Sequence, residues 1–175
     1  TDDEHPCQIL TDIFTFQEQR GPIRGKVVTY VGDGGCNVPV SWVHAASALD
    51  FELRIATPSE FQPSAETLSK AGGNISCTED IRAAVKGADM VYTDVWVSMG
   101  MEAEAEERLA KLAGYQINGE LMCLAKSDAL VMHCLPAYRG KEIDAKTFEA
   151  HADTIFTQAE NRLHTQKAIL AWLAG

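Results

Sequence analysis

The stretch Lys26-Val-Val-Thr-Tyr-Val31, followed by Gly32-Asp-Gly-Gly35, decides the fold class of this sequence. The six residues 26–31 form a short apolar run rich in β-branched side chains, which is typical of a buried strand. The glycines after it permit a tight turn, and residues 38–49 show the apolar spacing of a helix. A strand, a glycine loop and a helix in this order predict the repeating unit of a parallel α/β sheet.

The same alternation continues on both sides of this unit. A helix is expected from Pro6, where apolar residues recur at helical spacing until Gly21-Pro22 ends the pattern. Several strand-like runs are almost continuously apolar, which indicates burial on both faces of the sheet. We therefore predict one α/β domain over residues 1–175, with a doubly wound, mainly parallel sheet and helices on both faces, a Rossmann-like three-layer fold. Further strands are expected at residues 52–57, 74–77, 88–93, 129–133 and 154–156, and further helices at 64–71, 78–86, 101–112, 119–125 and 158–173.

Composition limits what the protein binds. The 175 residues are 46% hydrophobic, which suits one globular domain, and their formal net charge is −10. Because no stretch concentrates the basic residues that phosphate backbones require, we expect no nucleic-acid partner. No apolar run approaches the roughly 20 residues that cross a bilayer, so we expect no membrane partner either.

The cysteines and the first residues indicate the compartment. The chain has five cysteines without CxxC spacing, which predicts neither a disulfide framework nor a cysteine-rich zinc site. The acidic start, Thr1-Asp-Asp-Glu-His5, lacks the basic and apolar segments of a signal peptide. We therefore expect a reducing, cytoplasmic location.

In a doubly wound sheet, ligands bind beyond the carboxyl ends of the strands. At the first of these ends, the glycine loop lacks the third glycine of a GxGxxG motif and places Asp33 where a pyrophosphate would approach. The next strand ends in Ala56-Thr57, without the acidic residue that a dinucleotide site uses. The loop therefore disfavours a nicotinamide dinucleotide, and a tight turn is the simpler interpretation. Asn37, near the start of the following helix, either caps that helix or recognises a carboxylate or an amine.

Two later strand ends carry groups that could bind an amino acid. Asp94 could hold a cationic amine while Ser98 and backbone N–H groups of the same loop hold a carboxylate, and a turn with a helix cap is the alternative. His133 and Cys134 are neighbours on a strand and point to opposite faces, so we expect no Cys-His dyad. Both residue types are also common in protein cores, and the five dispersed histidines predict no metal site.

Two helix starts could contribute to binding an anion. His5-Pro-Cys-Gln8 opens the first helix, where free N–H groups and the positive end of the helix dipole attract negative charge. Arg162, near the start of the last helix, could point its guanidinium at the same anion, although an exposed position is common for arginine.

Taken together and in order, these motifs resemble those of the carbamoyltransferase family, and within it the ornithine carbamoyltransferases. The similarity runs over nearly the whole chain. His133-Cys-Leu-Pro136 differs from the tetrapeptide of the aspartate-specific members, and Asp94-x-x-x-Ser98-Met-Gly is similar to the ornithine-recognition loop. The other matching segments are His5-Pro-Cys-Gln-Ile-Leu-Thr-Asp-Ile-Phe-Thr15, Gly32-Asp33 with Asn37 and Ser41, and Glu160-Asn-Arg162.

The resemblance implies transfer of a carbamoyl group from carbamoyl phosphate to the δ-amine of L-ornithine, without a metal or an organic cofactor. It implies catalytic roles for Asp94 and Cys134, which would orient or deprotonate that amine. It also implies two sets of binding residues: Asn37, Asp94, Ser98 and Met99 for ornithine, and His5, Gln8, Cys134, Leu135 and Arg162 for carbamoyl phosphate.

The sequence departs from the family pattern in two respects. Cys36 stands where family members often have a second asparagine before Asn37. Family members also begin with a separate carbamoyl-phosphate domain bearing a Ser-Thr-Arg-Thr loop, and this sequence has no such loop. We therefore expect the L-ornithine-binding domain alone, inactive without its N-terminal partner domain, and a trimer-based homo-oligomer for the full enzyme. The alternatives are a transferase for another amine, such as an acylated ornithine, or a non-catalytic amino-acid-binding module.

Overall fold

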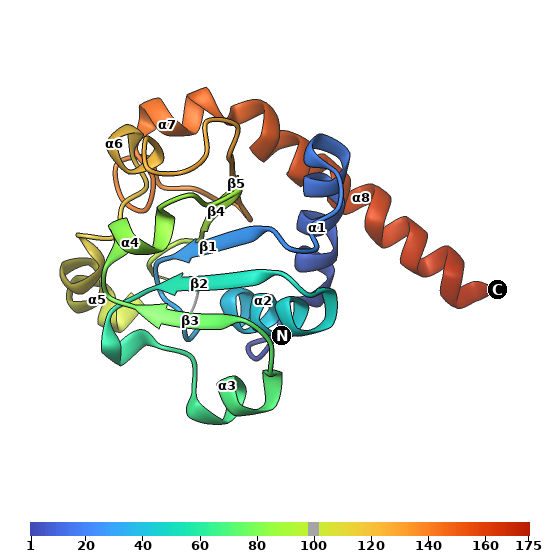
Figure 1. Cartoon of the computed structure of the whole chain (residues 1–175), viewed down its shortest axis with the longest axis horizontal. Helices are drawn as coiled ribbons and strands as arrows, with labels where there is room; N and C mark the ends of the chain where they lie inside the picture. Colours follow the sequence, from blue (N-terminus) through green and yellow to red (C-terminus); the bar gives the residue numbers. More distant parts are fainter. Residues whose placement is uncertain (98–101) are drawn as a thin grey trace.

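A computed structural model describes residues 1–97 and 102–175 of the chain. Its centre is a five-stranded parallel sheet in the order β3-β2-β1-β4-β5 (Figure 1). This order and direction confirm the predicted doubly wound α/β sheet. The strands are β1 (Val27–Val31), β2 (Glu52–Ala56), β3 (Ile75–Thr78), β4 (Met90–Thr93) and β5 (Leu130–His133).

Helices cover both faces of the sheet, as predicted. One face packs against α1 (Pro6–Arg20) and α2 (Asn37–Leu49), and the other packs against α4 (Ile81–Val85), α6 (Gly119–Met122) and α7 (Ala145–Ala150). The last helix, α8 (Ala152–Ala174), starts beside β5, crosses α1 and then projects away from the sheet (Figure 1). The remaining elements are α3 (Ala65–Ala71), α5 (Ala105–Leu112) and the 3₁₀ turns η1 (Ser59–Phe61) and η2 (Glu102–Glu104).

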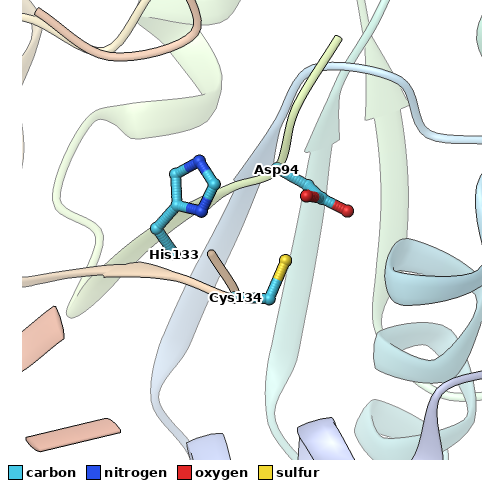
Figure 2. Close-up of side chains that lie close together, drawn as sticks. All are labelled: Asp94, His133 and Cys134. Atoms are coloured by element: carbon cyan, nitrogen blue, oxygen red, sulfur yellow. The ribbon is translucent and has the colours of Figure 1, made fainter. Parts of the chain in front are cut away.

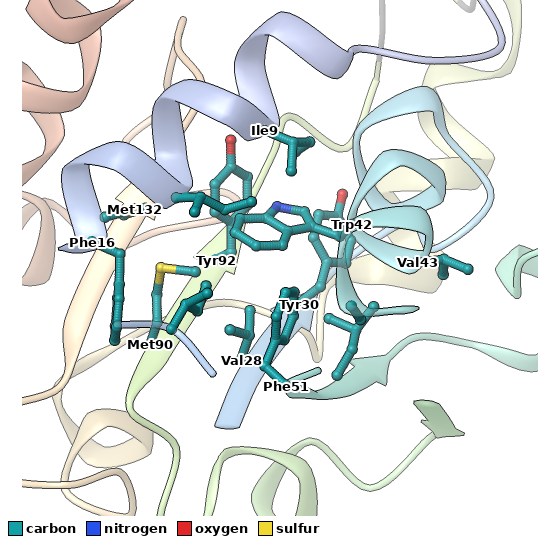
Figure 3. Packing of buried hydrophobic residues seen from close by; sticks show 14 of the residues in the cluster. Ile9, Phe16, Val28, Tyr30, Trp42, Val43, Phe51, Met90, Tyr92 and Met132 are labelled. Atoms are coloured by element: carbon teal, nitrogen blue, oxygen red, sulfur yellow. The ribbon is translucent and has the colours of Figure 1, made fainter. Parts of the chain in front are cut away.

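Alternating side chains of the strands fill two hydrophobic layers. Val28 and Tyr30 of β1 face α1 and α2, whereas Val31 faces the opposite helices. In the first layer Trp42 packs edge-on against Tyr92, with their ring centroids 5.5 Å apart (Figure 3). Burial on both faces explains why the central strands are almost continuously apolar.

Two predicted elements were wrong in type or extent, and one helix was not predicted. Residues 154–156 are not a strand, because they lie in the first turns of α8, where Ile155, Gln158 and Asn161 are buried at helical spacing. The helix expected at 78–86 begins only at Ile81, since Thr78 completes β3 and the Asp80 side chain caps the helix. The sequence analysis also missed α7, which is capped by Asp144.

The strand order places a topological switch point between β1 and β4. The chain proceeds from β1 outward to β2 and β3, and then returns to add β4 and β5 on the other side. At such a point the loops after the two central strands diverge and leave a crevice for ligands. The loop after β1 begins at Gly32, and the segment after β4 begins at Asp94. No helix in the described ranges 1–97 and 102–175 has the length and apolar character of a membrane span.

Candidate functional site

Asp94 and Cys134 meet at the carboxyl ends of two neighbouring strands. Each is the first residue after its strand, β4 or β5, and Figure 2 shows the sulfur of Cys134 pointing towards the Asp94 carboxylate. The potential ligand atoms of the two side chains lie within 4.8 Å of each other, and burial together with the negative charge of Asp94 raises the pKa of Cys134 well above its usual value. Cys134 therefore stays a neutral thiol.

His133 supports the turn that follows β5. The backbone N–H of Leu135 donates to His133 Nδ1 at 2.9 Å, so Nδ1 is an acceptor and the ring proton lies on Nε2. His133 Nε2 in turn faces Glu142 Oε1 at 3.1 Å, and both side chains are fully buried. The hydrogen bond from the Leu135 N–H to His133 Nδ1 holds Leu135 in the left-handed region, with φ at 56°. Both ring nitrogens of His133 are thus occupied, and the expected absence of a Cys-His dyad agrees with this geometry.

The side chains of Asp94, His133 and Cys134 also form a group that could be read as a metal site. Their potential ligand atoms lie within 4.8 Å of one another. However, a histidine binds a metal through a free ring lone pair, and the lone pair of His133 accepts the Leu135 N–H. The hydrogen bonds therefore disfavour a metal at this place.

The residues predicted to bind carbamoyl phosphate come from α1 and α8. His5 precedes α1, and its backbone N–H donates to Ser41 Oγ at 2.7 Å. Arg162 of α8 donates from Nη1 to Gln8 Oε1. Burial lowers the pKa of His5, the positive charge of Arg162 lowers it further, and the negative charge of Asp94 opposes this shift. The imidazole therefore lies within electrostatic reach of both charged groups.

The predicted site residues are thus only partly assembled in one place. His5, Gln8 and Arg162 lie together and near Asp94, which contacts Cys134. Leu135 follows Cys134 directly and is half-buried. Ser98 and Met99 lie outside the described residues.

Asn37 lies at the other side of the switch point. It is the first residue of α2, and its Nδ2 donates to the Thr1 carbonyl oxygen at 2.8 Å. The buried Arg108 side chain pairs with Asp33 of the glycine loop and donates from Nε to the Trp96 carbonyl oxygen at 3.1 Å. Arg108 therefore connects the loop that follows β1 to the segment that follows β4.

Sequence reasoning missed Asp12, Gln158 and Glu142, which are buried behind the site. For Asp12 a signal was available, because Gln8 and Asp12 are polar residues four apart on the same helix face as the apolar Ile9 and Phe16. Gln158 and Glu142 approach the end of β5 from distant parts of the chain, so no local pattern marks them.

Comparison with known proteins identifies the family of the chain. Residues 24–173 match the family model described as "Aspartate/ornithine carbamoyltransferase, Asp/Orn binding domain". The chain is 51% identical to the ornithine carbamoyltransferase of Methylococcus capsulatus over 173 residues, which is 99% of this chain and 58% of that protein. It is also 51% identical to the corresponding protein of Nitrosococcus oceani over 170 residues, which is 97% of this chain and 56% of the relative.

A solved structure is similar over the same extent. The anabolic ornithine carbamoyltransferase of Campylobacter jejuni matches with a TM-score of 0.93 and 40% identity, over 99% of this chain and 59% of that one. The chain thus spans less than two thirds of the length of these relatives. The matching family model, the sequence identity and the shared fold together show that the chain belongs to the aspartate/ornithine carbamoyltransferase family.

Proposed function

We propose that this chain is the L-ornithine-binding part of an ornithine carbamoyltransferase, which converts carbamoyl phosphate and L-ornithine to L-citrulline and phosphate. The observation that carries the proposal is the meeting of an acceptor and donors at one corner: Asp94 lies against Cys134 and acts electrostatically on His5, next to Arg162. A carboxylate near a cationic guanidinium and an imidazole suits a reaction between a cationic amine and an anionic carbamoyl donor. The names of the similar proteins support the same assignment.

The first task of the site is to bind and deprotonate the δ-amine. An alkyl amine has a pKa of about 10, so ornithine arrives as the non-nucleophilic ammonium. Asp94 pairs with this ammonium and accepts a proton from it, because the neutral thiol of Cys134 has no charge to offer. The Cys134 sulfur then serves to orient the amine next to Asp94.

The second task is to stabilise the charge that develops on the carbamoyl group. The amine nitrogen attacks the carbonyl carbon, a C–N bond forms, and the C–O bond to phosphate breaks with its electron pair leaving on the phosphate. The remaining extra proton of the nitrogen passes to the departing phosphate, and negative charge develops transiently on the carbonyl oxygen during the attack. Donors such as His5 and Arg162 would stabilise this oxygen, and Gln8 holds Arg162 in place through its side-chain oxygen.

The proposal extends to residues and partners beyond this corner. Asn37, Ser98 and Met99 would hold the α-amino and α-carboxylate groups of ornithine, and the backbone at Leu135 would contact the carbamoyl moiety. An N-terminal domain would bind the phosphate, so the chain alone would be inactive. The full enzyme would be a trimer-based homo-oligomer of the cytoplasm and would need neither a metal nor an organic cofactor.

A kinetic comparison of two carboxylates tests the proposal. The chain is joined to the remaining part of the enzyme, and citrulline formation is measured for Asp94→Asn and for Asp153→Asn, an exposed carboxylate of α8 that serves as control. Asp94→Asn should lower kcat/KM for ornithine by at least about tenfold and leave carbamoyl phosphate binding nearly unchanged, since it removes one charge-assisted hydrogen bond. Equal losses for both substrates, or faster turnover of an acylated ornithine than of ornithine, would contradict the proposal.

A further inference from the structure

Asp12 is a fully buried carboxylic acid that the reaction scheme does not use. It lies in the second turn of α1, at the interface with α8, and its side chain has no exposed surface. Its Oδ1 accepts two hydrogen bonds, from Gln8 Nε2 at 2.7 Å and from Gln158 Nε2 at 2.6 Å. Its Oδ2 has no hydrogen-bond partner among the described residues. A buried carboxyl group with an unsatisfied oxygen costs stability, so its presence calls for a compensating role.

The two hydrogen bonds decide how two primary amides are oriented. An amide that donates from its nitrogen to Asp12 must turn its oxygen the other way. The oxygen of Gln8 then accepts from Arg162 Nη1. The oxygen of Gln158 accepts from the backbone N–H of His133 at 3.0 Å, at the last residue of β5. One carboxyl group thus fixes both amides, and each amide holds a different part of the candidate site.

The parts held in this way lie far apart in the sequence. Arg162 belongs to α8, whereas His133 precedes the Cys134-Leu135 segment that follows β5. An amide rotated by half a turn would present an N–H group to Arg162 or to the His133 N–H, and two donors repel each other. Without Asp12, the Gln8 side-chain nitrogen loses its acceptor and the Gln158 nitrogen keeps only a 3.4 Å hydrogen bond to the Tyr92 hydroxyl, so both amides are held less firmly in this orientation.

We propose that Asp12 is a positioning residue, which holds Gln8 and Gln158 so that Arg162 and the backbone of residues 133–135 face the same carbamoyl donor. The identity of that donor rests on the proposed function, but the positioning itself does not. Asp12 acts through the two glutamines and touches no reacting atom.

Nuclear magnetic resonance of the 15N-labelled chain tests the positioning. The side-chain amide signals of Gln8 and Gln158 should exchange with water at least about tenfold more slowly than those of Gln17, which is exposed. Asp12→Leu should remove this protection from both amides, while Asp12→Asn, which keeps an acceptor oxygen, should preserve it. Thr15→Val is the matched control, because Thr15 is buried one turn further along the same interface and bonds to Asn161 instead. Protection of either glutamine that survives Asp12→Leu would overturn the proposal.

The unaltered chain provides a second measurement if Asp12→Leu does not fold. The charged and titratable groups that face the carboxyl are Arg162 from α8, the Tyr92 hydroxyl from β4, and Cys134 after β5. Ionisation of Asp12 should move the amide signals of Gln8 and Gln158 together, with one midpoint that Asp12→Asn abolishes. Two different midpoints, or no movement of either signal, would overturn the proposal.

Kinetic measurements on the longer enzyme, in which the chain is joined to the remaining part of the enzyme, then distinguish a positioning role of Asp12 from a role in stability alone. Asp12→Leu should raise KM for carbamoyl phosphate at least about tenfold and KM for ornithine less than about threefold, with Asp12→Asn close to the unaltered enzyme. Thr15→Val should lower stability but leave both constants unchanged. Unchanged constants in Asp12→Leu would overturn the functional part of the proposal. If the unaltered enzyme forms no citrulline, the proposed function fails, and the resonance measurements still decide whether Asp12 positions the amides.

Discussion

The two halves of α8 belong to one continuous helix but have opposite surroundings. The first half buries Ile155, Gln158 and Asn161 and sends Arg162 into the candidate site. The second half leaves large apolar side chains in solvent, among them Leu163 at 68% and Trp172 at 81% exposure. Figure 1 shows the same contrast, because the helix leaves α1 and ends far from the sheet. The apolar residues of a helix therefore do not by themselves indicate where the core lies, and the polar contacts of the first half show which part of the helix reaches the candidate site.

The largest expected effect separates the halves by activity. Arg162→Met in the longer enzyme should lower kcat/KM by about 10²–10³-fold, because in the proposed mechanism it removes a donor to the developing negative charge. Lys167→Met removes the same charge from an exposed position of the second half and should change kcat/KM less than about threefold. Steady-state citrulline assays measure both. Similar losses in the two variants would show that charge on the helix matters and position does not.

The second effect separates the halves by stability. Ile155→Ala removes a fully buried side chain from the layer beneath β5 and should lower the free energy of unfolding by about 2–5 kcal/mol. Leu170→Ala removes a similar side chain that is 67% exposed and should change it by about 0.5 kcal/mol or less. Urea unfolding of the chain gives both values. A large loss for Leu170→Ala would mean that the second half is packed in solution.

The third effect concerns the carboxyl group that faces the first half. Burial raises the pKa of Asp12 from 3.8 to about 7, against the opposing hydrogen bonds of the glutamines. The folded chain therefore holds this proton more tightly than the unfolded chain, and its free energy of unfolding falls as pH rises from about 4 to about 7. Between pH 5 and pH 7 the free energy of unfolding falls by roughly 2–3 kcal/mol for this reason.

Asp12→Asn removes this contribution because an amide does not titrate. The variant should gain stability relative to the unaltered chain as the pH rises, and urea unfolding at pH 5 and pH 8 measures the change. Asn118→Ala, which alters the cap of α6 away from Asp12, is a control whose effect should be the same at both pH values. A difference between Asp12→Asn and the unaltered chain that does not depend on pH would show that Asp12 keeps an ordinary pKa.

The smallest effect concerns self-association through the second half. Contiguous exposed apolar side chains favour contact between copies, and the net charge of −10 is screened over about 8 Å at physiological salt. The chain should therefore self-associate at high concentration, and Trp172→Glu should weaken this association. Light scattering over a concentration series provides the measurement. A strictly monomeric unaltered chain would contradict the expectation.

Much of the fold could be predicted from the sequence, because buried parallel strands and capped helices leave local patterns. The strand at residues 26–31 and the helix from Pro6 were found in this way. The strand expected at 154–156 failed because Thr154, Ile155 and Phe156 have strand-like side chains, whereas the helix depends on the contact of Ile155 with the sheet. Local propensity is weak where tertiary packing decides.

The candidate site was predictable only where a motif stands at a strand or helix end. Asp94, Cys134 and His5 could be singled out because they follow or precede regular elements, and the roles proposed for them rest on the family resemblance. The supporting residues were missed because their partners are distant in sequence: Gln158 is 146 residues from Asp12. Glu142 lies in a loop, and its contact with His133 follows from the path of the chain after β5.

One structure determination tests the central claim most directly: that of the longer enzyme with L-ornithine bound. In that structure we expect the δ-nitrogen to lie about 3 Å from a carboxylate oxygen of Asp94 and next to the Cys134 sulfur, with His5 and Arg162 on the side where the carbamoyl donor enters. Ornithine bound with its δ-amine turned away from Asp94, or bound outside the corner between β4 and β5, would contradict the account.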